Sequence, residues 1–145
     1  MKLHEKLSLI QQKFSAKKSR YNSFGKYNFR SAEDILEALK PVEAKYGVYF
    51  LVDEDLIGDA IIKSTATISD GVDAIHASAI VGVDLNQKGM QRPQQYGSAS
   101  SYGKKYALGN LLLIDDTADA DATNGDNGQS RFKPQTNTGA VDIGF

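Results

Sequence analysis

Residues 94–113 read QQYGSASSYGKKYALGNLLL, and this stretch decides how the chain is organised. Small residues fill its first half, and leucines close its second half. Gly97 and Ser98 predict a break followed by a helix N-cap, because a serine hydroxyl can accept a hydrogen bond from an amide of the first helical turn. From there we expect one helix that runs towards Leu113.

The middle of this predicted helix combines aromatic and basic side chains. Tyr102 and Tyr106 stand four residues apart, so they share one side of the helix, and Lys104 and Lys105 project from its middle. A helix of this kind suits a phosphate backbone. The same pattern is typical of an amphipathic helix with a solvated lysine pair, so the pattern alone leaves both interpretations open.

Composition limits the class of protein. A chain of 145 residues that is 41% hydrophobic fits one domain plus a tail. Cysteine is absent, which excludes disulfides, thiolate metal sites and cysteine nucleophiles. We find neither an apolar signal core at the N-terminus nor an apolar run of bilayer length, so we expect a cytoplasmic protein without membrane contact.

Charge divides the chain into two unlike parts. Residues 115–145 hold six acids and two bases, a net charge of −4, whereas residues 1–114 hold 15 bases and 12 acids, a net charge of +3. We therefore expect a mildly basic domain over residues 1–114. Residues 115–145 lack periodicity and large apolar residues until their end, which predicts a disordered acidic tail with an apolar tip.

The N-terminal part contains a predicted helix and an aromatic segment. Apolar residues at helical spacing predict a helix over residues 2–18 with a basic end. Residues 21–31, YNSFGKYNFRS, interleave Tyr27 and Phe29 with Lys26 and Arg30 in a turn-rich context. These rings either fasten a loop to the core, or stack on unpaired bases while the cations neutralise phosphates.

The next segments predict a helix and then three strands. Ser31 and Asp34 form a capping-box pattern for a helix that Pro41 should end or kink near Lys40. Residues 48–57, 59–69 and 72–83 show strand composition, with a tight turn at Asp70-Gly71. The predicted order is α-α-β-β-β-α: an α+β domain in which helices pack on a three-stranded antiparallel meander. His76, inside the last strand, is expected to pack or to pair across strands rather than bind metal.

The sequence contains no recognisable catalytic motif. Five residues separate Gly97 from Gly103, and Lys104 is followed by Lys105 rather than Ser or Thr, so this is not a phosphate-binding P-loop. The aspartates at 115, 116, 119 and 121 fall in the predicted tail, where a metal site would lack support. The sequence therefore predicts no enzyme, no cofactor and no metal site.

Two motifs together resemble the ERF family of single-strand annealing proteins, which are phage recombinases grouped with the Rad52-like annealers. One is the Y-N-F-R run of residues 27–30. The other is a Q-x-x-G-S-x-x-S-Y-x-x-x-Y-A-L run that is followed by an aspartate-rich segment. The second run comprises Gln94, Gly97, Ser98, Ser101, Tyr102, Tyr106, Ala107 and Leu108. The resemblance extends from about Leu3 to Asp121.

The resemblance implies a protein that binds single-stranded DNA without ATP, assembles into rings or helical filaments, and pairs complementary strands in the host cytoplasm. We hypothesise that the basic helix and the aromatic segment contact the DNA, through Lys104, Lys105, Lys26, Arg30, Tyr27, Phe29 and Tyr102. Family members usually carry arginine in the basic pair. Lysine keeps the positive charge here but lacks the planar guanidinium group that can donate two parallel hydrogen bonds. The chain is short for such a recombinase, and part of the usual C-terminal region is expected to be missing.

The last residues, VDIGF, resemble the acidic tip of bacterial single-stranded DNA-binding proteins, which partners recognise through a terminal phenylalanine. Asp142, Ile143 and Phe145 would form that tip and dock onto replication or repair proteins, although Gly144 replaces the usual proline. Chance similarity over five residues is the alternative. The leading hypothesis is ATP-independent annealing, and the alternative is a protein that coats and protects single strands and recruits partners through its tip.

Overall fold

The computed structural model describes residues 1–16, 18, 20–86 and 88–114 of the chain. The described part has the element order α1-β1-β2-α2-β3-β4-β5-α3. The predicted α+β class and its three-stranded meander are confirmed, and a short hairpin, β1–β2, is added between the first two helices. The disordered tail and apolar tip predicted for residues 115–145 lie outside the described residues.

The sheet consists of β3 (Tyr49–Ile57), β4 (Ile61–Ser69) and β5 (Ala74–Gly82), with β4 in the middle and both pairings antiparallel. Ala66 at its centre pairs with Val52 on one side and Ala77 on the other. The turn predicted at Asp70-Gly71 is present, since Gly71 has a φ of +94° and joins β4 to β5. His76 pairs across strands as expected, with its Nδ1 2.7 Å from the Thr67 hydroxyl.

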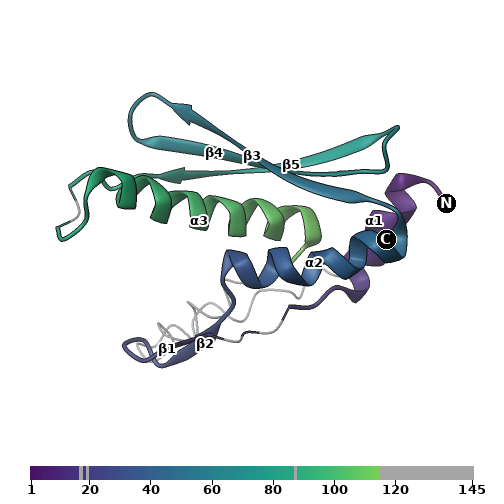
Figure 1. Cartoon of the computed structure of the whole chain (residues 1–145), viewed down its shortest axis with the longest axis horizontal. Coiled ribbons are helices and arrows are strands. Elements are labelled where there is room, and N and C mark those ends of the chain that lie inside the picture. Colours follow the sequence, from purple (N-terminus) through teal and green to yellow (C-terminus); the bar gives the residue numbers. More distant parts are fainter. Residues whose placement is uncertain (17, 19, 87, 115–145) are drawn as a thin grey trace, which may run out of the picture.

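The long helix α3 (Arg92–Leu112) lies along one face of this sheet, and α2 lies on the other side of α3 (Figure 1). Side chains on the α3 side of β4 are buried, as alternation in a strand requires. The opposite face of the sheet carries no helix or strand in the part of the chain that the structure describes (Figure 1).

Helix α3 begins earlier than the sequence predicted. Its first turn is at Arg92 and Pro93, with Gln91 as the N-cap residue, so Gly97 and Ser98 lie inside the helix rather than at its start. Proline suits the first turn because its missing N–H has no helical partner there. The Gln94 side chain completes the start by accepting a hydrogen bond from the Gln91 amide at 3.0 Å.

Small residues let α3 approach the sheet closely. A Cβ atom at Gly103 would meet the buried Ser64 side chain of β4, with Ser64 Cβ only 3.3 Å away. Glu54 of β3 joins the same contact, since its carboxylate accepts hydrogen bonds from Ser64 at 3.2 Å and from Ser100 of α3 at 2.7 Å. The glycine at position 103 therefore sets the spacing between helix and sheet.

Helix α2 (Ala32–Tyr46) starts as predicted and ends later than predicted. The Ser31 hydroxyl accepts a hydrogen bond from the Asp34 amide at 3.1 Å, and the Asp34 carboxylate accepts one from the Ser31 amide at 2.8 Å. Pro41 does not end the helix near Lys40. The helix continues to Gly47, whose φ of +67° terminates it, because burial of the apolar face outweighs one lost backbone hydrogen bond.

Helix α1 (Leu3–Lys13) is shorter than the predicted span of residues 2–18. Phe14 adopts extended backbone angles and packs against the core, and Ala16 is buried beyond it, so the chain turns inwards instead of continuing the helix. The main core lies where α1, α2 and the end of α3 meet the sheet. Its most deeply buried large side chains are Ile10, Ile35, Ile68, Leu108 and Leu112.

Candidate nucleic-acid interface

The aromatic segment of residues 21–31 forms a small hairpin rather than a loop. Strand β1 (Arg20–Asn22) pairs antiparallel with β2 (Tyr27–Phe29), and Arg20 lies opposite Phe29. The Asn22 side chain closes the turn, because its Oδ1 accepts hydrogen bonds from the amides of Phe24 and Gly25 at 2.9 and 3.0 Å. The hairpin projects from the N-terminal end of α2 (Figure 1).

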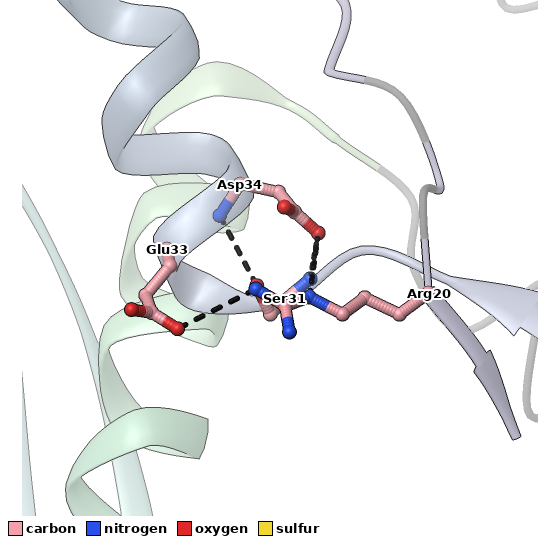
Figure 2. Close-up of polar contacts among 4 residues, drawn as sticks. All are labelled: Arg20, Ser31, Glu33 and Asp34. Carbon is pink, nitrogen blue, oxygen red and sulfur yellow. Dashed lines mark hydrogen bonds and ion pairs between the residues drawn. The ribbon is translucent and has the colours of Figure 1, made fainter.

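Ion pairs fix the root of this hairpin to α2. Figure 2 shows Arg20 reaching two carboxylates of the first helical turn, with Nη2 3.5 Å from Glu33 and Nε 3.6 Å from Asp34. Asp34 is also the partner of Ser31 in the capping box. One carboxylate therefore supports both the helix start and the hairpin.

The structure brings Lys105 and Phe29 together, although they are far apart in the sequence. Lys105 lies on α3, and its Nζ is 5.7 Å from the centre of the Phe29 ring on β2. A cation over the face of an aromatic ring is held there by the electrostatic quadrupole of the ring. This contact joins the basic helix to the aromatic hairpin, so the two predicted halves of the interface form one surface.

The neighbouring residues of α3 extend this surface. Tyr102 and Tyr106 are 52% and 44% exposed, and their ring centres are 5.9 Å apart. Lys104 and Lys105 are both half-buried. One residue step turns Lys104 about 100° around the helix from Lys105, on the side away from the two tyrosines, so it lies at the border of this surface. About half of the Tyr102 side chain faces solvent, so this ring is not buried against the sheet.

The remaining predicted residues occupy different places. Lys26 is exposed at the hairpin turn, where its φ of +56° is left-handed. It lies about 10 Å along β2 from Phe29. Arg30 is half-buried with its Nε shielded from solvent, which makes it a less open contact than Lys26. Tyr27 lies in β2, and its side chain is outside the described part of the structure.

Sequence reasoning left two exposed aromatic residues out of the site. Tyr106 was noted only as the helical neighbour of Tyr102, and the contact between the two rings places it in the surface. Phe24, at the hairpin turn, is 96% exposed. An aromatic ring between serine and glycine was the available signal, because such a turn cannot bury it.

The surface offers cations and rings, which suit binding rather than covalent chemistry. No group of three or more His, Asp or Glu side chains converges on a metal position within the described residues. Among those same residues, no helix has the length and apolar character needed to cross a bilayer. The predicted tip residues Asp142, Ile143 and Phe145 lie outside the described part of the chain, and their role stays a prediction.

Comparison with known proteins shows the family to which the chain belongs. The model of the ERF superfamily matches residues 3–142. The chain is also similar to the Essential recombination function protein of Salmonella phage P22, at 46% identity over 121 residues, and spans 81% of its own length but only 58% of that relative. No solved structure matches the chain. The chain belongs to the ERF superfamily.

Proposed function

We propose that this protein binds single-stranded DNA and anneals complementary strands without ATP during phage recombination, within the bacterial host cytoplasm. The contact between Lys105 and Phe29 carries the proposal, because it combines a basic helix and an aromatic hairpin in one surface. The similarity to a phage recombination protein supports the biological setting. Annealing requires no covalent bond to be made or broken, so no enzymatic step is needed.

Lysines of the surface would neutralise the DNA backbone while the bases stay available. Lys104, Lys105 and Lys26 supply the cations, and each neutralised phosphate releases counterions into solution. Tyr102 and Phe29 offer rings on which a base of any identity can stack, so we expect little sequence preference. Base pairing then supplies the free energy, and the protein reduces repulsion between two backbones.

We further propose that subunits assemble into a ring or helical filament, which would join these surfaces into a longer groove. The open face of the sheet supports assembly, because it exposes apolar side chains that water disfavours. Tyr49 and Leu51 lie at one end of this face, and Ile57, Ile61 and Ile80 lie towards the other end, with the polar row Asp53–Thr65–Ser78 between them. Edge strands β3 and β5 also each pair on one side only within the described residues, and unpaired strand edges favour contact with another chain.

Replacement of both surface lysines tests the DNA site. Lys104→Ala/Lys105→Ala should weaken binding to a labelled oligothymidylate and reduce the slope of log affinity against log salt by about 1–2, since roughly 0.7 ions are released per contact with a single strand. Fluorescence anisotropy over a series of salt concentrations measures both quantities.

A control variant removes the same charge elsewhere. Lys40→Ala/Lys45→Ala lowers the net charge equally, but both of these lysines are exposed on α2, away from α3 and from the open face of the sheet in sequence and element. We expect this control to keep nearly the wild-type salt slope. If both double variants behave alike, the surface on α3 is not the DNA site and only net charge matters.

A further inference from the structure

Phe24 is the most exposed large apolar side chain of the described residues, at 96% exposed. It lies in the turn that joins β1 to β2. This turn points away from the labelled helices and the sheet (Figure 1). A ring held in water gains nothing for folding, because apolar surface stabilises a protein only when it is buried. Its position therefore suggests a contact made with another molecule.

The turn that carries Phe24 is held in place by hydrogen bonds. The Asn22 carboxamide oxygen accepts from the amides of Phe24 and Gly25, and the Lys26 amide donates to the Asn22 carbonyl oxygen at 2.7 Å. Ion pairs of Arg20 then fix the hairpin root to α2 (Figure 2). A ring on such a support can bind with little further loss of conformational entropy.

Charge identifies the kind of partner that this tip suits. Residues 21–31 contain two bases, Lys26 and Arg30, and no acid. The Lys105–Phe29 contact lies at the other end of β2, at most about 17 Å from Phe24 along the chain. A polyanion that follows β2 from the hairpin root would therefore meet Lys105 first and then Lys26, which lies in the same turn as the exposed ring.

The turn between β4 and β5 provides a contrast within the same protein. Val72 there is 88% exposed, but it stands between Asp70 and Asp73. Hydrogen bonds from the amides of Asp73 and Val72 hold the pKa of the Asp70 carboxyl below its usual value, so this tip stays anionic at neutral pH. Such a tip would repel a phosphate backbone.

We infer that the Phe24 ring stacks on an unpaired base of the strand whose phosphates the lysines hold. This inference rests on the proposed function and adds a base-binding position to it. Every base has a π-face, so the contact is expected to tolerate all sequences. A ring placed against one base would interrupt stacking within the strand and so oppose hairpins that delay annealing.

The absence of tryptophan from the chain gives a direct test. Phe24→Trp introduces a single indole at the tip, and its fluorescence should be quenched when oligothymidylate binds. An oligomer of the same length built of abasic sugar-phosphate units should bind without quenching, because it offers phosphates but no bases. Val72→Trp is the matched control and should keep its fluorescence with both oligomers.

Binding measured by anisotropy in the same samples separates the possible failures. Oligothymidylate that binds without quenching Phe24→Trp would overturn the stacking inference and leave the proposed function in place. Emission that shifts with protein concentration before DNA is added would also overturn it, because the ring would then contact a second copy of the chain. Failure of wild-type protein to bind either oligomer would contradict the proposed function itself.

Two further substitutions test how much the Phe24 ring contributes to DNA affinity. Phe24→Ala should weaken binding to oligothymidylate about tenfold, while Phe24→Tyr should bind like wild type because it keeps an aromatic face. Binding of the abasic oligomer should not change in either variant. An equal loss with both oligomers would show that the substitution disturbs the hairpin, and would overturn a role in base stacking.

Discussion

The lack of a Cβ atom at Gly103 allows α3 to lie close to strand β4 of the sheet. A Cβ there would meet Ser64, which is fully buried and hydrogen-bonded to Glu54. We predict that Gly103→Ala lowers the free energy of unfolding by about 1–2 kcal/mol, because overpacking exceeds the gain in helix propensity. Chemical denaturation followed by circular dichroism measures the change.

A double variant shows whether the contact with Ser64 is the cause. Ser64→Ala removes the hydroxyl that the new methyl group would meet, so adding Gly103→Ala to it should cost much less than in the wild-type background. If Gly103→Ala is at least as stable as wild type, close packing does not constrain this position.

At this scale the sequence predicted residue types better than contacts. Lys105 and Phe29 were both expected to bind DNA, but their contact depends on how β2 lies against α3, which no local pattern encodes. Arg30 was expected to be an open phosphate contact, yet its Nε is shielded from solvent. Burial of one atom in a long side chain depends on tertiary packing.

In helix α2, tertiary packing overrides a helix-breaking proline. Pro41 lies inside the helix, is exposed, and cannot donate the backbone hydrogen bond that its position requires. We predict that Pro41→Ala raises the free energy of unfolding by about 1–3 kcal/mol, since the missing donor is restored and no buried contact is lost. Thermal melting should show a higher midpoint.

Proline also restricts the unfolded chain, so its removal carries an opposing effect. Ala38→Gly on the same helix is a useful comparison, because it should lower stability by about 1 kcal/mol or more through helix propensity. A lower melting midpoint for Pro41→Ala would mean that the proline stabilises a bend that the fold needs.

The three sheet strands were predictable because alternation over nine residues is a strong signal, and their register follows from short turns. The hairpin was not, since three-residue strands are too short to show alternation. The start of α3 was misplaced because Gly97 and Ser98 are typical of helix boundaries, whereas here both lie inside the helix. Pro93 was the signal that marked the true first turn.

For the whole molecule, the open face of the sheet predicts self-association. Leu51→Lys combined with Ile80→Glu leaves the net charge unchanged, and both side chains are exposed, at 51% and 66%. We predict that this variant falls to the mass of a single 15.8 kDa chain in light scattering and keeps its melting midpoint. The wild-type protein should be oligomeric.

Val72→Gln is the control, because Val72 is an exposed apolar residue in the turn between β4 and β5 and not in a strand of that face. It should leave the mass unchanged. A wild-type protein that is monomeric at micromolar concentration, or a double variant with the wild-type mass, would exclude the open sheet face as the subunit interface.

The central claim is that this protein brings complementary strands together, and strand annealing tests it most directly. Two complementary labelled oligonucleotides are mixed with the full chain, without nucleotide, at low and high salt. The account predicts that pairing is faster than in the absence of protein at low salt, and that the acceleration is lost at high salt as phosphate contacts weaken. Tight binding of each strand with slower pairing would contradict the account and identify a protein that coats single strands.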